Sequence, residues 1–296
     1  MRDFKRQKSS AVEFRNRISP AGGVSPLAAR CFSVAVFLLV SFTAVPVLAQ
    51  SFELPVDISL PVITLSHVGG NTVLPRQNQK PELTIRGDGT ITVSDSLGRG
   101  KDLESRISDE DLHRLMTFVL NDEHLPEFDA GNAQFAINAI NARCGHSLRV
   151  TDAAFTVIHV HLANEDFEGN FYALGVFAEA YPIVKPLGRL WKVERRLRQL
   201  AEEIKAGGKD AVASALEVAA ANIQQQTDPF DLKLEDYAQV LMNGDNNRTL
   251  EFIHDRGDGT STSVIVTYNL PQAPTVSLRT VRNPQPEVMT CPQVQQ

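Results

Sequence analysis

The stretch that decides the fold is residues 81–94, Pro-Glu-Leu-Thr-Ile-Arg-Gly-Asp-Gly-Thr-Ile-Thr-Val-Ser. Apolar and polar residues alternate on both sides of a central Gly-Asp-Gly, which is the pattern of two half-buried strands joined by a tight turn. Glycine permits the turn conformations that other residues adopt only with strain. The sequence therefore predicts a β-hairpin over 81–94.

A capped helix is predicted directly after this hairpin. Ser108 is placed to accept hydrogen bonds from the first free backbone N–H groups, and Asp111 is placed to reach back. The apolar residues that follow recur at helical spacing and are Leu112, Leu115, Met116, Val119 and Leu120. One hairpin and one helix cannot bury their apolar sides alone, so further strands are expected.

The surrounding residues complete an α+β domain predicted over 58–206. The expected elements are a strand at 62–65, a helix at 133–142 with Phe135, Ile137 and Ile140 as its apolar side, a hairpin of strands at 155–163 and 170–181, and a Leu-rich helix at 187–204 with Trp191 in the core and Gly207-Gly208 at its end. The fold class that follows is α+β, with a mixed or antiparallel sheet built from hairpins and covered by helices.

The C-terminal part reads as a separate, smaller unit. An Ala-rich helix at 210–224 has a shallow small-residue face, so 207–228 is predicted to be a connecting helix. Three strands in a meander are predicted within 229–283, and the polar tail 284–296 is expected to be flexible. The pentapeptide Arg-Gly-Asp-Gly-Thr occurs at 86–90 and again at 256–260. Both copies fall in predicted turns, so we interpret the recurrence as shared turn chemistry.

The N-terminus has the features of a secretory signal. Seven basic residues lie within the first 30, and residues 32–45 are almost continuously apolar. This run of about 14 residues is too short to span a bilayer comfortably. Val47-Leu48-Ala49 offers small residues at a cleavage site, so residues 1–49 are predicted to be a signal peptide cleaved after Ala49, with retention as an anchor as the alternative. The mature chain is then periplasmic or secreted, with no membrane attachment.

Charge argues against a nucleic-acid partner. Residues 1–49 hold seven of the 29 basic and two of the 35 acidic side chains, so the mature chain has a formal charge of −11. Such a chain offers no basic stripe to displace the counterions of a polyanion. The basic cluster around 192–198 is interspersed with glutamates and is interpreted as a solvated helix face.

Two cysteines, Cys144 and Cys291, follow the predicted cleavage site. In an oxidising compartment they can pair and tie the C-terminal tail to the middle of the chain. The alternatives are inert thiols or, with His146 two residues from Cys144, a thiol nucleophile.

His159 and His161 carry the strongest chemical signal. Two histidines separated by one residue point to the same side of a strand, which is a geometry that zinc sites use. Glu165 lies in the following turn and is the candidate base of a metal-dependent hydrolase, for which His146 and His113 are the nominated third ligands. The opposing interpretation is that 158, 160 and 162 face the core while both histidines face water, and no cofactor is bound.

The absence of catalytic motifs favours a non-catalytic protein. The sequence has no Gly-x-Ser-x-Gly, no phosphate-binding Gly-x-x-x-x-Gly-Lys, no His-Glu-x-x-His and no Cys-x-x-Cys. The leading prediction is therefore a binding or structural module of the cell envelope that contacts a protein, peptide or glycan. The alternatives are the zinc hydrolase and an inhibitor or chaperone-like partner of another exported protein.

A family resemblance points the same way. The pattern consists of Pro81-x-Leu-x-Ile-x-x-Asp-Gly-x-Ile, then Ile107-Ser-x-x-Asp-Leu112, Phe128-Asp129, Thr151-Asp152 and a hairpin followed by a Leu-rich helix. Over roughly residues 60–205 it resembles uncharacterised secreted or periplasmic bacterial proteins with a domain of unknown function. The resemblance implies a small α+β domain and leaves the activity open.

Overall fold

The structure is a computed structural model. It describes residues 52–70, 80–94, 101–145, 147–242, 247–269 and 271–282. The predicted signal peptide, Cys291, His146 and the predicted tail at 284–296 lie outside the described residues.

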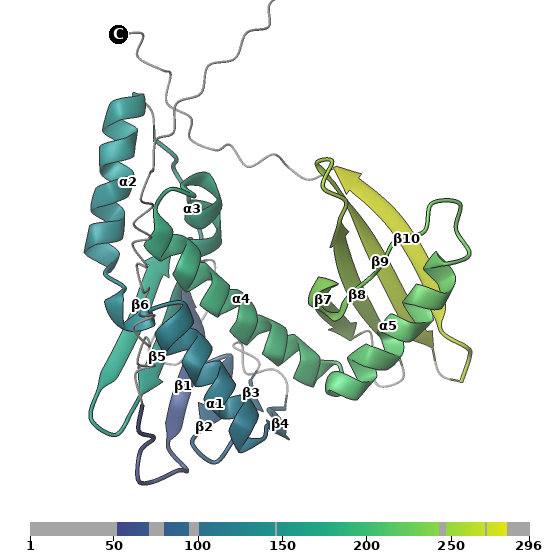
Figure 1. The fold of residues 1–296 in the computed structure, drawn as a ribbon, viewed down its shortest axis with the longest axis horizontal. Coiled ribbons are helices and arrows are strands. Elements are labelled where there is room, and N and C mark those ends of the chain that lie inside the picture. The colour runs from purple at the N-terminus through teal and green to yellow at the C-terminus, as the bar shows by residue number, and fades with distance from the viewer. Residues whose placement is uncertain are drawn as a thin grey trace, which may run out of the picture. The chain divides into compact units, whose positions relative to one another are not determined.

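Within the described residues, two antiparallel sheets and five α-helices confirm the α+β class (Figure 1). The first sheet has the strand order β4-β3-β2-β1-β5-β6. Its strands are β1 (Pro61–Gly69), β2 (Leu83–Arg86), β3 (Thr90–Val93), β4 (Leu103–Arg106), β5 (Ala154–His161) and β6 (Asp166–Tyr172). Its helices are α1 (Asp109–Thr117), α2 (Ala130–Cys144), α3 (Leu174–Ala180) and α4 (Lys185–Lys205).

The predicted hairpin forms two neighbouring inner strands of this sheet, β2 and β3. Leu83 pairs with Val93 and Ile85 with Ile91, and all four side chains are at most 3% exposed. Burying an aliphatic side chain of this kind contributes about 1.5–3 kcal/mol relative to leaving it exposed. Figure 1 shows α1 and α4 on the same face of the sheet, which is the face that these residues line.

The predicted cap of α1 is present. The Asp111 backbone N–H donates to Ser108 Oγ at 3.1 Å, and Ser108 Oγ donates to Asp111 Oδ2 at 2.9 Å. The three acidic residues of the first turn also favour the positive end of the helix dipole.

We expect Ser108→Ala to lower the free energy of unfolding by about 1 kcal/mol, because the Asp111 N–H loses its acceptor. Urea unfolding at neutral pH measures this change. The exposed Ser147 caps no helix and gives a matched control, Ser147→Ala, expected to stay within about 0.5 kcal/mol. Equal effects of the two changes would contradict the capping role.

The prediction of a strand over 170–181 is wrong after Tyr172, and the strand begins earlier than predicted, at Asp166. β6 ends at Tyr172, Ala173 adopts a left-handed conformation with φ 50°, and α3 follows. Leu174 and Ala178, one helical turn apart, are both buried. Alanine, leucine and glutamate in this segment also favour a helix, so burial of the pair and local propensity act together against the strand.

The predicted apolar face of 133–142 is also partly wrong. Ile137 is 1% exposed and Ile140 packs against the core, but Phe135 is 75% exposed. Phe135 lies two residues from Ile137, so a helix places the two on different sides. Trp191 is only partly buried in the core, and the Arg195 guanidinium lies 5.2 Å from its ring centre.

The second sheet has four strands rather than the predicted three. They are β7 (Tyr237–Met242), β8 (Asn247–Asp255), β9 (Thr260–Asn269) and β10 (Thr275–Arg282), in the order β10-β9-β8-β7. Helix α5 (Lys209–Ile223) is not merely a connector. Its buried side chains form a second core with the sheet and are Val212, Ala215, Ala219 and Ile223. Small residues on α5 let it lie close to the strands.

The two Arg-Gly-Asp-Gly-Thr copies lie in hairpin turns, one between β2 and β3 and one between β8 and β9. Their backbones differ, since Gly257 has a positive φ and its counterpart Gly87 does not. In each, the Asp side chain accepts from the Thr backbone N–H at 2.9 Å. In each, the Arg side chain donates to the Thr hydroxyl six residues later, at 3.0 Å in the first and 2.8 Å in the second. The same polar side-chain contacts therefore close both hairpins.

Candidate functional site

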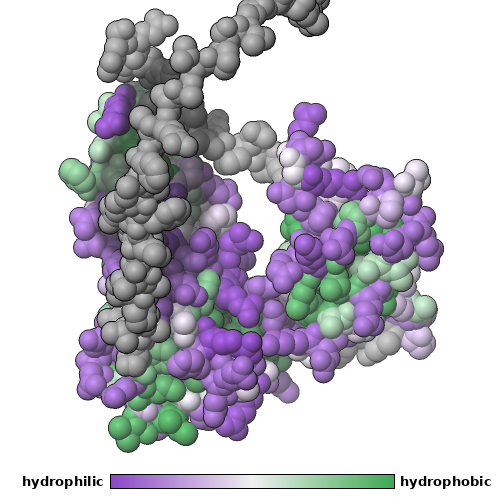
Figure 2. All heavy atoms as spheres, viewed as in Figure 1, coloured by the Kyte–Doolittle hydropathy of each residue, from purple (hydrophilic) through white to green (hydrophobic). Residues whose placement is uncertain are grey.

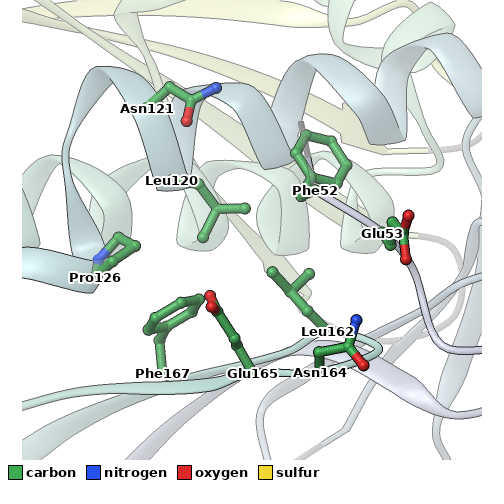
Figure 3. A pocket seen from close by; sticks show the side chains of 9 residues that line it. All are labelled: Phe52, Glu53, Leu120, Asn121, Pro126, Leu162, Asn164, Glu165 and Phe167. Atoms are coloured by element: carbon green, nitrogen blue, oxygen red, sulfur yellow. The ribbon is translucent and has the colours of Figure 1, made fainter. Parts of the chain in front are cut away.

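A hollow of 410 Å³ opens where three irregular segments around the first sheet meet. They are the extended chain before β1, the end of the first helical segment and the turn between β5 and β6. The residues that line it are Phe52, Glu53, Leu120, Asn121, Pro126, Leu162, Asn164, Glu165 and Phe167 (Figure 3). We call this hollow the Glu165 pocket.

One wall of the Glu165 pocket is shaped by an irregular helix end. α1 continues into a π-helical turn, Phe118–Asp122, closed by the Glu123 N–H donating to Phe118 O at 2.9 Å. His124 then adopts a left-handed conformation with φ 51° before the short 3₁₀ turn Leu125–Glu127. A π-turn changes the direction in which its residues project, and such turns are frequent at functional sites.

The opposite wall is fixed by backbone hydrogen bonds. The Ala163 N–H donates to Glu53 O at 2.9 Å, which attaches the N-terminal segment to the β5–β6 turn. The Leu162 N–H donates to Glu165 O at 2.8 Å and closes that turn. The Phe52 ring lies 4.9 Å from the ring of His113 on α1. Both glutamates of the pocket thus extend from backbone that is already held in place.

The lining combines an apolar interior with two acids. Figure 3 shows the Glu165 side chain pointing from the turn toward Leu120, beside Phe167, with Glu53 on the other side of Leu162. Leu120 and Leu162 are each 7% exposed, whereas Glu53 and Glu165 are exposed. None of the described lining residues is basic. The exposed lining is more polar than apolar, because Asn121 and Asn164 join the two acids around the apolar side chains. This pocket suits a cation carried on an apolar stem.

The sequence-predicted histidines lie elsewhere on the hairpin. His159 and His161 are on β5, with Ile158 and Val160 buried on the opposite side of the strand. His159 Nε2 lies 3.3 Å from Glu168 Oε2, and His161 Nδ1 contacts Asp166 Oδ1. Neither histidine lines the Glu165 pocket. The structure thus brings each histidine to a carboxylate of β6 and does not bring Glu165 to them.

The two other histidines predicted as zinc ligands do not join His159 and His161 in the described residues. His113 packs against Phe52, and His146 lies outside the described residues. Within the part of the chain that the structure describes, there is no group of three or more His, Cys, Asp or Glu side chains arranged to hold a metal ion. Cys144 ends α2 and is disulfide-bonded. Because Cys291 is outside the described residues, its pairing with Cys144 stays a prediction.

Sequence reasoning missed a charged cluster centred on His67. From β1, His67 Nδ1 lies 2.8 Å from Glu82 Oε2, and His67 Nε2 lies 2.9 Å from Glu194 Oε1 of α4. Arg198 Nη1 lies 3.8 Å from the same oxygen of Glu194. The partners are 15 and 127 residues from His67 in sequence, so no local pattern could have indicated them.

The cluster favours a charged imidazole. Burial lowers the pKa of His67, but the hydrogen bonds and charges of Glu194 and Glu82 outweigh it and raise the pKa to about 9. Burial raises the pKa of Glu82, and the contact with His67 reverses this and lowers it. Both imidazole nitrogens are engaged, so His67 joins β1 to α4 rather than offering a free base or ligand.

No helix among the described residues is long and apolar enough to cross a membrane. Comparisons with protein-family models, curated proteins and solved structures found no match, so the resemblance of residues 60–205 to uncharacterised exported bacterial proteins stays a prediction.

Proposed function

We propose that this chain is an exported, non-catalytic binding module whose Glu165 pocket accepts a lysine or arginine side chain of a protein or peptide. The observation that carries the proposal is that Glu53 and Glu165 both line a hollow of 410 Å³ that also contains apolar side chains and no described basic residue. The apolar walls would contact the methylene stem, and the two carboxylates would pair with the cationic end. A periplasmic or secreted location, with cleavage after Ala49, belongs to the same proposal.

A peptide series tests this recognition. The probe is acetyl-Gly-Lys-Phe-amide, titrated into the purified protein by calorimetry at low salt. Its partner replaces lysine with norleucine, which retains the apolar stem without the charge. We expect the norleucine peptide to bind about tenfold more weakly, which corresponds to about 1.4 kcal/mol. Equal affinity of the two peptides would contradict recognition of a cation.

We expect Glu165→Gln to weaken binding of the lysine peptide about fivefold, because one carboxylate partner is lost while the shape of the pocket is retained. Glu53→Gln is also expected to weaken binding of the lysine peptide. The matched control is Glu179→Gln on α3, an exposed glutamate that does not line the pocket, which should leave the affinity unchanged. A loss of affinity in the control equal to that in Glu165→Gln would show a general charge effect instead of a site.

The zinc hydrolase with His159 and His161 as ligands is the competing prediction. Elemental analysis of the purified protein distinguishes the two. Near-stoichiometric zinc that disappears in His159→Ala would overturn the proposal of a non-catalytic module.

A further inference from the structure

The second sheet ends on one side in a strand that is paired along one edge only. β10 and β7 are its two outer strands (Figure 1). β10 pairs with β9 over its whole length, Thr275–Arg282, without a bulge. In an outer strand, every second residue directs its backbone N–H and C=O away from the sheet. These groups can bond to a further strand.

The strand registers identify the outward-facing residues of β10. The Arg256 N–H donates to Thr260 O at 3.1 Å, and these residues continue the β8–β9 register, so they form a hydrogen-bonded pair. Because such pairs alternate, the even-numbered residues of β9 bond to β8 and the odd-numbered ones bond to β10. In the β9–β10 register, odd-numbered residues pair with odd-numbered residues. The outward-facing residues of β10 are therefore Val276, Leu278, Thr280 and Arg282.

The opposite edge of the sheet agrees with this assignment and is protected. The same alternation directs the Val240 N–H of β7 outward, and this group donates to Glu202 Oε2 at 3.1 Å. A register shift between Tyr237 and Gln239 also interrupts β7. Side-chain cover and irregular pairing are two ways in which proteins prevent an edge from pairing.

β10 lacks these protections. Among the described residues, none bonds to its outward-facing backbone groups, and the strand contains no proline. Its Arg279 directs its backbone toward β9, opposite Ser263, and so leaves the outward-facing backbone groups accessible. The open edge is therefore regular over the length of the strand.

The side chains along the open edge are partly apolar. Val276 and Leu278 lie on the α5 side of the sheet, where they are only partly buried against the second core. Figure 2 shows hydrophobic side chains, in green, at the surface where α5 lies against the second sheet. A further strand beside β10 would cover the outer side of Leu278.

We infer that β10 pairs antiparallel with β10 of a second molecule of this chain, around a two-fold axis at Leu278. Each Leu278 then bonds to the other, and Val276 bonds to Thr280 of the second molecule. Arg279 lies opposite Ser277, whereas an axis at Arg279 would place two guanidinium groups opposite each other, which is unfavourable. A two-fold pairing uses the same edge of both molecules and completes both at once.

Sedimentation velocity of the purified full chain over a concentration series tests the inference. We expect a monomer–dimer equilibrium. Thr280→Pro removes an outward N–H and no bond to β9, so an edge strand tolerates it. It is expected to raise the dimer dissociation constant about tenfold. The matched control is Thr280→Ala, which loses the side chain, retains the N–H and should dimerise as the wild type does.

Leu278→Lys is a second variant that leaves the backbone unchanged. It places two ammonium groups opposite each other at the axis and is also expected to weaken the dimer about tenfold. Circular dichroism verifies that both variants fold. In the wild type, hydrogen exchange at the Leu278 and Thr280 amides should become slower as the protein concentration rises, because dimerisation follows mass action.

Three results would overturn the inference. One is a monomer at concentrations up to about 0.5 mM. Another is a dimer that neither Thr280→Pro nor Leu278→Lys weakens, which would place the interface elsewhere. The third is slow exchange of the Leu278 amide at every concentration, which would mean that the edge is already paired within one molecule. None of these results bears on the lysine-peptide test, because the Glu165 pocket is lined by residues between 52 and 167 only.

Discussion

His67→Ala is expected to lower the free energy of unfolding by about 3 kcal/mol at pH 7, since removal of one partner from a partly buried charged cluster leaves the buried Glu194 poorly compensated. Glu194, with its side chain 7% exposed, loses its closest cationic contact and keeps Arg198 at 3.8 Å. The strand β1 also loses its polar link to α4. Urea denaturation measures the change.

The same substitution is expected to alter the pH dependence of stability. The folded-state pKa of His67 is raised to about 9 from an ordinary value of 6.5. A raised pKa means that the folded state binds the proton more tightly, so this contribution is complete below pH 6.5 and is lost as the pH rises through 9. The lowered pKa of Glu82 acts in the opposite direction, and its contribution is lost in acid.

We therefore expect the wild type to lose more stability between pH 7 and pH 10 than His67→Ala does. The matched control is His159→Ala, because His159 is 53% exposed and has a carboxylate contact at 3.3 Å. His159→Ala should lower the free energy of unfolding by less than about 1 kcal/mol, as expected for an exposed ion pair. Parallel stability curves for the wild type and His67→Ala would show that the imidazole is not charged in the folded protein.

Gly89→Ala is expected to lower the free energy of unfolding by a similar amount, about 3 kcal/mol. Gly89 has φ +81°, a conformation that costs an L-residue about 1–2 kcal/mol. A Cβ atom at this position would lie 2.5 Å from Ile107 O. This oxygen belongs to the backbone directly after β4, so it cannot move away unless the end of β4 moves too. Overpacking of this kind adds about 1–3 kcal/mol. The Ile107 N–H also donates to Gly89 O at 3.0 Å, so the turn and the edge of the sheet move together.

A glycine that also has a positive φ but has open space around it supplies the control for Gly89. Gly257 has φ +74°, but no atom lies within 4 Å of the position of a Cβ. Gly257→Ala is expected to cost only the conformational part, about 1 kcal/mol. Thermal or urea unfolding of both variants gives the comparison. Equal losses would mean that the contact with Ile107 does not contribute.

Local sequence patterns predicted the structure correctly where the hydrogen bonds join residues close in sequence. The Ser108 cap depends on residues three apart, and the two Gly-Asp-Gly turns depend on residues two apart. Both were predictable because a short segment determines its own conformation there. The period-two pattern around 83–93 likewise predicted which side chains are buried.

Long-range packing decided the elements that were predicted wrongly. The segment after Tyr172 mixes the strand-favouring Val176, Phe177 and Tyr181 with three alanines. It packs closely against α4, where a Cβ atom added at Gly175 would lie 3.3 Å from Trp191 Nε1. Helix α5 resembled a connector because alanine carries little hydrophobicity. Its alanines form a core only because the second sheet lies close to the helix. A local sequence pattern does not reveal that the sheet is there.

The candidate site was predictable in one residue only. Glu165 follows a strand in an acidic turn, and this local position is what the sequence indicates about it. Phe52 and Glu53 belong to a segment without a periodic pattern, and Leu120 reaches the pocket through a π-helical turn. Such a turn changes side-chain direction without a sequence signature.

The most direct test of the central claim is an amide chemical-shift titration of the ¹⁵N-labelled protein with acetyl-Gly-Lys-Phe-amide. The proposed function predicts saturable shifts centred on Phe52, Leu120, Leu162 and Phe167, with the exposed face of α2 unaffected. The absence of saturable shifts around the Glu165 pocket, or shifts confined to α2, would contradict it.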